Sequence, residues 1–301
     1  MNNDFIASLK KPRLLYRIWK RFLSWFYFEQ WILLISSNTS NNPPSWKQFK
    51  PLLPPTDRFW ADPFIWRQND DYFIFYEELP YATNRGVISC ITLDKGMNIV
   101  DNCVVLERPY HLSYPFIFEY EQQLYMIPET GENTTVELYS CRNFPNKWEF
   151  VKVLIPGYYA VDATLFEREG KWWLFANIAE ESDSTWDTLY AFYADTPITD
   201  QWTPHPKNPI VKDVHSARPA GRIILQNGNL IRPSQDCSVR YGYALNFNHI
   251  TTLTETDYSE TLVSSFRPPR FNPIIATHTW NELGNLRAID AKMWRRKFKS
   301  Y

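Results

Sequence analysis

One pattern recurs five times along this chain of 301 residues, and it restricts the fold more than any other feature. Each copy starts with a short apolar run that follows a small or polar residue, and a polar turn then leads into a second apolar run. The clearest copy is Ala61-Asp62-Pro63-Phe64-Ile65 followed by Tyr72-Phe73-Ile74-Phe75, and similar copies occupy 113–127 and 161–175. Weaker copies lie at 217–231 and 277–289. Repeats of this kind are typical of architectures built from one repeated unit.

The repeat length indicates which architecture this is. The aligned first positions are Asp62, Tyr114, Asp162, Arg218 and His278, so the copies are spaced by 52, 48, 56 and 60 residues. A third β-like segment follows in four copies, at 86–93, 136–141, 188–194 and 241–247. Four short strands in about 50 residues make one propeller blade. The sequence therefore predicts an all-β, five-bladed β-propeller.

The residues before the first copy suggest how the ring closes. Residues 30–35 (Gln-Trp-Ile-Leu-Leu-Ile) are strongly β-like, and an N-terminal strand that completes the last blade leaves no exposed sheet edge. We expect a strand at 30–37 and a basic, aromatic helix at 12–27. The expected organisation is an N-terminal helix segment at 1–29, a propeller at 30–290 and a basic C-terminal tail at 291–301.

Charge is unevenly distributed along the chain. Residues 1–24 and 287–301 each carry six basic side chains against one acid, and the rest of the chain has 20 basic and 31 acidic residues, a net charge of −11. Basic ends on an acidic body suggest contact with an anionic membrane surface, although ordinary solubilising termini explain them equally well. The apolar stretch 22–35 contains Glu29 and is too short to span a bilayer. We expect a cytoplasmic protein that is peripheral to a membrane if these ends bind it, and no nucleic-acid partner.

In a propeller the innermost strand of each blade lines the central axis, so the five aligned residues should meet at one mouth. Two carboxylates, a guanidinium and an imidazole gathered there would perturb one another's pKa values. The structural alternative is that Asp62 and Asp162 are ordinary turn residues. Glu129 ends the second strand of its unit, where Glu77 is its equivalent, and either points to the mouth or is solvated.

Two or three carboxylates around a sugar-sized pocket can support glycoside cleavage, with one group protonating the leaving oxygen and another activating water or attacking the sugar. Arg218 and Arg232 in the fourth unit suit an acidic or phosphorylated ligand, or else pair with Asp162 and Asp236. No P-loop, HExxH or GxSxG motif is present, and the five histidines show no close pairing. We expect no cofactor and no metal.

Several segments together resemble a known domain. They are Phe59-Trp60-Ala61-Asp62-Pro63-Phe64, His111-Leu112-Ser113-Tyr114-Pro115-Phe116, Met126-Ile127-Pro128-Glu129-Thr130, Val161-Asp162-Ala163-Thr164-Leu165-Phe166, Ala217-Arg218-Pro219-Ala220-Gly221, Arg232-Pro233-Ser234-Gln235-Asp236 and His278-Thr279. Over residues 30–290 the chain resembles the propeller domain at the N-terminus of plant glucosamine inositolphosphorylceramide transferases. The resemblance implies a glycan or glycolipid partner. The 301 residues show no counterpart of the glycosyltransferase domain of those proteins, so the resemblance does not carry over their transferase activity. A glycosyltransferase partner is expected if the chain is a recognition module.

More distantly, the arrangement is similar to the five-bladed glycosidases of the arabinanase, xylosidase and invertase clan. Asp62 matches the blade-one Asp of that clan, and Asp162 fits its supporting carboxylate. The acid Glu of the clan comes from blade four, where this chain has Arg218 and Arg232, so Glu129 is the replacement. The implied roles are Glu129 as general acid, Asp62 as base or nucleophile, and Asp162 as the carboxylate that tunes and orients them.

Two hypotheses about function follow from these residues. The first is a glycosidase-like or glycosyl-transferring enzyme acting on a polar or anionic glycan. The second is a non-catalytic module that recognises a glycan or glycolipid head group for a partner enzyme. In both, the expected substrate-binding residues are Tyr114, His111, Arg218, Arg232, Gln235 and His278.

Overall fold

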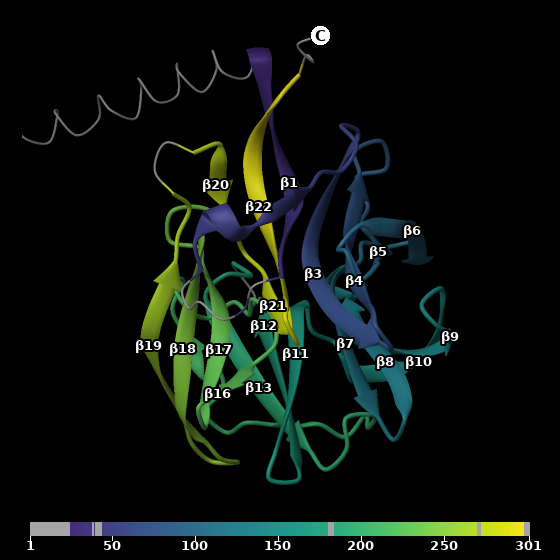
Figure 1. Ribbon diagram of the computed structural model, residues 1–301. Coiled ribbons are helices and arrows are strands. Elements are labelled where there is room, and N and C mark those ends of the chain that lie inside the picture. Colours follow the sequence, from purple (N-terminus) through teal and green to yellow (C-terminus); the bar gives the residue numbers. More distant parts are fainter. Residues whose placement is uncertain (1–24, 38, 40–43, 180–183, 270–271, 298–301) are drawn as a thin grey trace, which may run out of the picture.

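The computed structural model describes residues 25–37, 39, 44–179, 184–269 and 272–297, and it shows a ring of five antiparallel sheets around a common axis (Figure 1). The predicted five-bladed β-propeller is therefore confirmed. Each sheet is one blade, and its strands run in chain order from the axis outward, except in the last blade.

The strands of the first four blades follow the predicted repeat. Blade one contains β3 (Arg58–Gln68), β4 (Asp71–Pro80), β5 (Val87–Leu93) and β6 (Ile99–Leu106). Blade two contains β7 (Ser113–Tyr120), β8 (Gln123–Glu129), β9 (Thr135–Asn143) and β10 (Lys147–Pro156). Blade three contains β11 (Ala160–Arg168), β12 (Lys171–Ile178) and β13 (Thr188–Ala194), with β14 (Thr203–Pro204) and β15 (Val211–Lys212) both paired to β13. Blade four contains β16 (Ile224–Gln226), β17 (Asn229–Asp236), β18 (Ala244–Leu253) and β19 (Tyr258–Phe266).

Blade five joins the two ends of the propeller. From the C-terminal side it takes β20 (Ile274–Ala276), β21 (Trp280–Leu283) and β22 (Leu286–Arg296), and from the N-terminal side β1 (Tyr27–Ser36) and β2 (Lys50–Leu52). β1 pairs with β22 along its whole length, from Tyr27 opposite Arg296 to Ser36 opposite Arg287. The ring is thus closed by the N-terminal strand, as expected, and β2 adds a second N-terminal strand at the outer edge.

The core consists of five apolar layers, one between each pair of neighbouring blades. Successive side chains of a strand point to opposite faces, so the middle strands must be apolar on both sides. In β1, for example, Leu33 and Ile35 pack toward blade one, whereas Ile32 and Leu34 pack toward blade four. This explains why the middle strands read as continuous apolar runs in the sequence.

Two predicted boundaries differ from the structure. Residues 12–24 of the expected helix lie outside the described residues, and Tyr27, its expected last residue, is the first residue of β1. The tail expected at 291–301 is wrong in its first part, because β22 continues to Arg296. Its basic residues lie on a paired strand: Lys292 Nζ is 3.2 Å from Glu29 Oε2, and Arg295 donates to the carbonyl of Pro54 across 2.8 Å.

Trp25 and Phe26, within the expected helix, have helical backbone, and short 3₁₀ segments lie at Trp46–Gln48 and Gly131–Asn133. In that part of the chain, no helix has the length and apolar character needed to cross a bilayer.

Candidate functional site at the propeller mouth

The residues at the aligned repeat position share an unusual backbone geometry on the inner strands of the first three blades, although none of them is the first residue of its strand. Asp62, Tyr114 and Asp162 have φ values of 51°, 42° and 55°. Each lies in a register shift, between β3 and β4, β7 and β8, and β11 and β12, respectively. A bulge with a left-handed residue re-aims its side chain, and a non-glycine residue in this region costs about 1–3 kcal/mol. The same strained bulge in three blades supports the repeat alignment and directs these side chains toward the axis.

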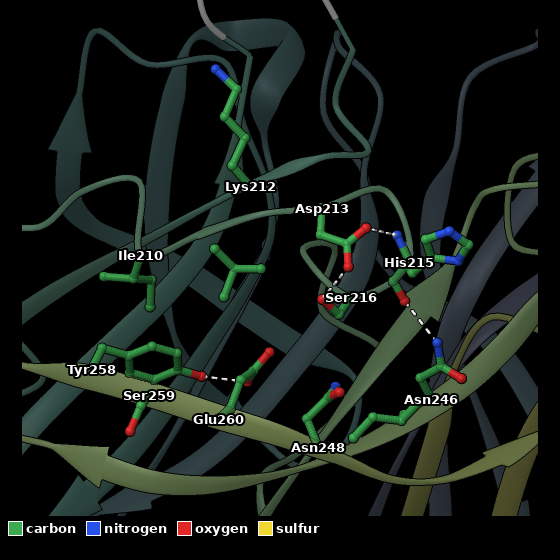
Figure 2. Close-up of a pocket in the computed structure, with 12 residues that line it drawn as sticks. Ile210, Lys212, Asp213, His215, Ser216, Asn246, Asn248, Tyr258, Ser259 and Glu260 are labelled. Atoms are coloured by element: carbon green, nitrogen blue, oxygen red, sulfur yellow. Dashed lines mark hydrogen bonds between the residues drawn. The ribbon is translucent and has the colours of Figure 1, made fainter.

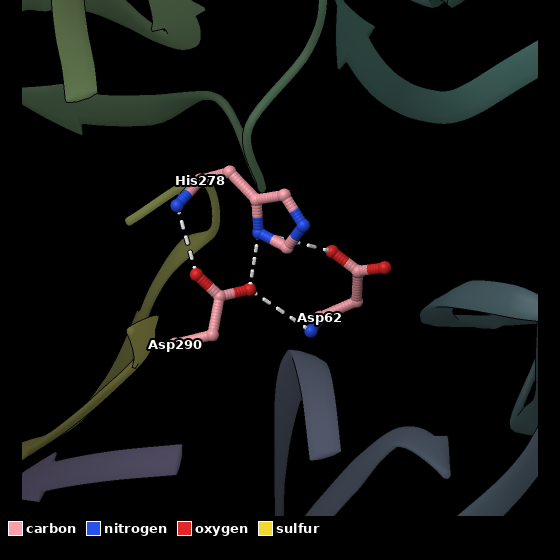
Figure 3. Close-up of side chains that lie close together, drawn as sticks. All are labelled: Asp62, His278 and Asp290. Carbon is pink, nitrogen blue, oxygen red and sulfur yellow. Dashed lines mark hydrogen bonds and ion pairs between the residues drawn. The ribbon is translucent and has the colours of Figure 1, made fainter. Parts of the chain in front are cut away.

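Asp62, His278 and Asp290 form one hydrogen-bonded group, drawn in Figure 3. His278 Nδ1 donates to Asp290 Oδ2 across 2.5 Å, and it lies 3.8 Å from Asp62 Oδ1. The backbone N–H of Asp62 donates to Asp290 Oδ2 across 3.1 Å, and the Thr279 hydroxyl donates to Asp62 Oδ1 across 2.6 Å. Blade one and blade five are therefore joined at the mouth by a buried acid–imidazole–acid arrangement.

The charges of this group favour an imidazolium ion. Burial lowers the pKa of His278, but the carboxylates of Asp290 and Asp62 outweigh it and raise that pKa to about 9. The ring is stacked on Trp31 with centroids 4.1 Å apart, and it meets the edge of Tyr241 at 5.2 Å. His278 is thus held in one orientation from both sides.

The same three side chains are the one set of potential metal ligands found in the described residues, with ligand atoms within 4.8 Å of one another. Their atoms are already engaged, because Asp290 Oδ1 also accepts the N–H groups of His278 and Thr279 at 2.8 and 3.1 Å. A metal ion would have to displace the bond between His278 and Asp290. The arrangement is that of a hydrogen-bonded triad.

Asp162 lies in a second buried group, which connects blade three to blade four. Arg218 Nε donates to Asp162 Oδ2 across 2.6 Å, and Gln235 Nε2 donates to the same oxygen across 3.0 Å. Arg218 Nη1 donates to the carbonyl and the hydroxyl of Thr185 at 3.1 and 3.0 Å. Its guanidinium also lies over the ring of Tyr241, 4.9 Å from the centroid. Asp162 is thus a compensated carboxylate.

Glu129, from the end of β8, lies at the edge of this second group. No hydrogen-bonded cation balances its negative charge. Its Oε2 is 3.8 Å from Arg218 Nη2, beyond hydrogen-bonding range, and it is a buried oxygen with no hydrogen-bond partner among the described residues. Burial and then the charge of Asp162 raise the pKa of Glu129 to about 8, although Arg218 and His111 oppose the shift. Glu129 therefore holds a proton at neutral pH.

Asp62 is the second carboxyl whose ionisation is shifted toward neutrality. Burial is the main cause and raises its pKa to about 7, the charge of His278 opposes this, and the charges of Glu77, Asp162 and Asp290 add to it. Its Oδ2 accepts no hydrogen bond from the described residues. The mouth thus contains two largely shielded carboxyl groups, Asp62 and Glu129, that titrate near neutral pH.

His111 is placed at the rim by blade one. Its Nε2 lies 3.2 Å from Glu77 Oε1, and its Nδ1 accepts the backbone N–H of Gly86 across 3.0 Å. A nitrogen that accepts an N–H is unprotonated, so in this geometry Nε2 carries the proton and donates it to Glu77. Burial lowers the pKa of the half-buried His111, but Glu77, Glu129 and Glu132 outweigh it and raise that pKa to about 9. When protonated, the ring is positively charged toward Glu129 and no longer accepts the N–H of Gly86.

Two residues expected to bind substrate have other partners. Tyr114 is fully buried, and its hydroxyl accepts the N–H of Gly221 across 2.7 Å and meets the Thr164 hydroxyl at 2.9 Å, so it joins blades two, three and four. Arg232 donates from Nε to Glu260 across 2.8 Å, toward the outer strand β19. The structure therefore brings Asp62, Glu129, Asp162, Arg218, Gln235 and His278 together as the axial cluster, and it places Arg232 outside that cluster.

The partners of Arg232 belong to a separate polar pocket between blades three and four (Figure 2). Glu260 and Ser216 line this cavity of about 420 Å³, and Arg232 donates to the carbonyl of Ser216 across 2.6 Å. Tyr258 donates to Glu260 across 2.5 Å, and Asp213 accepts the backbone N–H of His215 across 3.0 Å. The pocket walls are thus held by interactions within blade four and its preceding loop.

A cavity of about 580 Å³ lies beside the axial cluster. Its described lining is Tyr159, Ala179, Ser184, Thr185 and Trp186. Thr185 holds Arg218, and the charges of Glu129 and Arg218 both act on Tyr159, so the cavity adjoins the uncompensated carboxyl. Aromatic side chains such as Tyr159 and Trp186 offer faces on which sugar rings can stack.

Sequence reasoning missed Asp290, Thr279 and Trp31, which orient His278 and Asp62. For Asp290 a signal was present, since it is the single carboxylate inside the apolar run of β22 and is fully buried. A lone acid in a buried strand requires compensating partners. Which partners it would find was not evident, because Asp62 lies 228 residues away.

Comparison with known proteins agrees with this architecture. The family model described as "Glucosamine inositolphosphorylceramide transferase 1, N-terminal" matches residues 53–290. The chain is 34% identical over 242 residues to glucosamine inositolphosphorylceramide transferase 1 of Oryza sativa subsp. japonica, covering 76% of this chain and 32% of that protein. It is 35% identical over 211 residues to the Arabidopsis thaliana protein of the same name, covering 67% and 27%. The chain thus spans about a third of the length of these relatives.

Among solved structures, a family 117 glycoside hydrolase from Zobellia galactanivorans matches with a TM-score of 0.56 and 13% identity over 89% of this chain and 90% of that one. An α-L-arabinofuranosidase from Lactobacillus brevis matches with a TM-score of 0.53 and 14% identity over 79% and 90%. Identities this low show a common fold alone. By sequence, the chain belongs to the family of the N-terminal domain of glucosamine inositolphosphorylceramide transferases.

Proposed function

We propose that this protein is carbohydrate-active and that it binds a polar or anionic sugar in the cavity beside the axial cluster, where Glu129 acts as a proton donor. The observation that carries the proposal is the state of Glu129: its side chain is 12% exposed, its buried Oε2 lacks a hydrogen-bond partner in the described chain, and its pKa is about 8. A carboxylic acid kept neutral at physiological pH is the group that general acid catalysis of glycosyl transfer needs.

Asp62 is the second reacting group in this proposal. Its pKa of about 7 leaves an appreciable fraction ionised at neutral pH, so it can act as a base toward water or an acceptor hydroxyl, or as a nucleophile. Asp162 does not react. Its bonds to Arg218 and Gln235 fix it in place, and its negative charge helps to keep both Glu129 and Asp62 protonated.

The substrate class follows from the cavity and from the family. Tyr159 and Trp186 would stack on the sugar, and Arg218 and His278 supply positive charge toward polar or acidic substituents. The plant relatives are named for transfer to inositolphosphorylceramide, a glycolipid precursor, so a glycolipid head group is the first ligand to test. The relatives are named as transferases, so a partner glycosyltransferase is part of the same proposal.

A panel of glycans, glycolipid head groups and sugar nucleotides tests the proposal, with product release measured for wild type, Glu129→Gln and Asp62→Asn. We expect turnover of at least one substrate, loss of turnover by at least about 100-fold in Glu129→Gln, the usual contribution of a general acid, and unchanged binding by calorimetry. Glu119→Gln, on the exposed face of β7 in the same blade, is the matched control and should behave as wild type. Full activity of Glu129→Gln would contradict the assignment.

Recognition without turnover is the second candidate, and one observation favours it. Asp162 accepts hydrogen bonds from Arg218 and Gln235, and Asp62 Oδ1 accepts one from Thr279, so two of the three nominated carboxyl groups take part in hydrogen bonds between blades. In this case wild type would bind a member of the panel, would release no product, and would bind unchanged after Glu129→Gln. The two candidate functions therefore predict the same binding results and differ only in whether the wild-type protein releases product.

We also propose that the basic ends bring the protein to an anionic membrane surface from the cytoplasmic side. The support is the six basic side chains in residues 1–24, since on the C-terminal side Arg287 is buried and Lys292 is paired with Glu29. Co-sedimentation with phosphatidylserine vesicles should decrease in high salt and on Arg17→Glu, whereas neutral vesicles should not bind. Salt-insensitive solubility in the presence of anionic vesicles would exclude this.

A further inference from the structure

The paired strands β1 and β22 form a two-stranded ribbon that extends past the start of the inner strands (Figure 1). Gln30 Nε2 donates to the carbonyl of Arg58, the first residue of β3, across 2.5 Å. From Gln30 the strand continues for three more residues to Tyr27, which is about 10 Å at about 3.3 Å per residue. The ribbon therefore ends in a tip that projects from the end of the propeller where Asp62 lies.

Both ends of the described chain lie at this tip. Tyr27 is opposite Arg296 in the ribbon, and the backbone N–H of Lys297 donates to the carbonyl of Phe26 across 2.8 Å. Residues 1–24 and 298–301 are therefore joined to the chain at one place. The six basic residues that support membrane association are thus attached to the tip and not to another part of the propeller.

Two large aromatic side chains are exposed at the tip. Trp25 is 64% exposed and Phe26 is 49% exposed, and they directly precede β1. Exposed apolar surface on a projecting element marks contact with a partner or with lipid. Tryptophan is enriched at the membrane–water interface, where its ring lies at the level of the head groups.

Positive charge accompanies these rings. Arg296 and Lys297 are exposed, and neither forms an ion pair within the described ranges. Glu29, the acid of β1, is paired with Lys292. Exposed aromatic rings beside uncompensated cations complement an anionic lipid surface, since the cations attract the head groups and the rings enter the acyl boundary. The end of a ribbon is also narrow, and a fluid bilayer closes around such a projection, whereas a folded partner would need a matching cavity.

We propose that Trp25 and Phe26 insert into an anionic bilayer and that this contact turns the mouth of the propeller toward the membrane. The inference rests on the membrane association proposed above, and it specifies the lipid-contacting residues and the orientation. Insertion adds an apolar contribution to binding that salt does not screen.

The orientation follows from the position of the ribbon relative to the axial cluster. Trp31 stacks on His278, and it is four residues from Tyr27 along β1, so about 13 Å of one strand joins the cluster to the tip. Tyr159, which lines the cavity beside the cluster, directly precedes β11 and lies at the same end of the propeller. A glycolipid anchored in the bilayer would present its head group to the side of the propeller that carries this cavity.

Co-sedimentation of the full chain with mixed phosphatidylserine and phosphatidylcholine vesicles tests the insertion. The double variant Trp25→Ser/Phe26→Ser should bind at least about tenfold more weakly than wild type, because the apolar contribution is lost. Phe150→Ser, at a ring that is also 49% exposed but lies on the outer strand β10, is the matched control and should bind like wild type. Equal binding by the double variant would overturn the insertion and leave electrostatic association intact. Absence of wild-type binding would overturn both proposals.

Brominated phosphatidylcholine in the same vesicles identifies the inserted ring, because bromine quenches only a nearby indole. Wild-type fluorescence should decrease on binding. Trp25→Phe keeps an aromatic ring, so it should still bind but lose most of this quenching. Unchanged quenching in Trp25→Phe would place another tryptophan in the bilayer and refute the assignment.

Hydrogen exchange on vesicles tests the orientation. The amides of Tyr158 and Tyr159 should exchange more slowly on binding. The turn at Asn227 and Gly228 should be unaffected, because it lies at the opposite end of β17 from Gln235, which contacts the axial cluster. Slower exchange at this turn and not at the tyrosines would refute the orientation. The sugar proposal is tested separately, since the double variant should turn over soluble substrates like wild type.

Discussion

Arg218 donates to Asp162 Oδ2 across 2.6 Å, but its Nη2 lies 3.8 Å from Glu129 Oε2. Arg218 thus forms a direct hydrogen-bonded ion pair with Asp162, whereas it acts on Glu129 only by longer-range electrostatic attraction. Burial first, and the neighbouring Asp162 second, raise the pKa of Glu129 and so disfavour its anion. This asymmetry produces a neutral acid beside a sugar-sized cavity, and it leads to the first prediction.

Glu129→Gln should change how stability depends on pH. The pKa of Glu129 is about 8 in the folded chain against an ordinary 4.5, so between these values the folded state binds a proton that the unfolded state releases. This difference in proton binding adds to the free energy of unfolding, and the addition is fully present below about pH 4.5. It is lost as the pH rises to about 8, at up to about 1.4 kcal/mol per pH unit. Glutamine cannot ionise, so the variant escapes this loss.

Urea unfolding of both proteins between pH 5 and pH 9 measures the effect. The difference in free energy of unfolding, variant minus wild type, should grow up to about pH 8 and then level off. Glu119→Gln provides the control and should run parallel to wild type at every pH. Parallel curves for Glu129→Gln would show that Glu129 is already ionised at neutral pH.

Asp290→Asn should disrupt the triad in blade five. The Asp290 carboxylate accepts four N–H groups, from His278 twice, from Thr279 and from Asp62. An amide nitrogen cannot accept any of them, so at least one buried donor becomes unpaired and the charge partner of His278 is lost. We expect destabilisation of about 3 kcal/mol, in the range for breaking one side of a buried charged pair.

The same variant should lower the pKa of His278, which Asp290 helps to raise to about 9. Titration of the His278 ring followed by NMR separates this from a purely structural loss. Asp290→Glu, which restores the charge, should recover the high pKa even where it costs stability. A His278 pKa that stays unchanged in Asp290→Asn would contradict the electrostatic role.

Tyr114→Phe should weaken the structure and leave sugar binding intact. The Tyr114 hydroxyl is the acceptor for the buried N–H of Gly221, and its loss leaves that donor unpaired at a cost of about 1–3 kcal/mol. Thermal unfolding and calorimetric sugar binding distinguish the two roles. Weaker binding by a well-folded Tyr114→Phe would instead place this residue among the ligand contacts.

Gly221→Ala should be among the most damaging small substitutions in the chain. A Cβ at Gly221 would come within 2.0 Å of the Trp280 carbonyl oxygen, and φ is +128°. We expect a loss of about 4 kcal/mol or more, or no folded protein. Gly228→Ala is the matched control, since its φ is +80° but nothing lies within 4 Å; there only the backbone cost of about 1 kcal/mol remains. Equal effects at both positions would show that the contact with Trp280 is unimportant.

Much of the fold could be predicted from the local pattern of apolar residues in the sequence. The second strands of the first three copies and the third strand at 188–194 lie where the apolar runs predicted them, because a strand buried on both faces must be apolar at successive positions. The third strand of blade four begins at Ala244 and not at residue 241. Gly242, with φ of +58°, lies in the turn before it. Turn geometry of this kind is weakly encoded in an apolar pattern.

From the sequence, the candidate site could be predicted only as a set of positions in the repeat. Asp62, Asp162, Arg218 and His278 share one position in the repeat, and the propeller brings equivalent positions to its axis. Tyr114 shares that position too, but its longer side chain crosses to blades three and four and is used for packing. Arg232 has the same charge as Arg218, yet it lies on a strand face that turns it toward Glu260.

The sequence by itself determined the number of blades, the closing strand and the repeat position shared by the axial residues, because these depend on spacing and on apolar alternation along the chain. It did not determine the first residue of each inner strand, since β3 begins at Arg58, before Asp62, and β16 begins at Ile224, after Arg218. Only the tertiary structure decided which of the clustered charges are compensated. That choice depends on left-handed bulges at Asp62, Tyr114 and Asp162 and on partners up to 228 residues apart. Neither a backbone angle nor a contact across the ring is visible in a linear pattern, and the burial that sets the pKa of Glu129 exists only once the blades have closed.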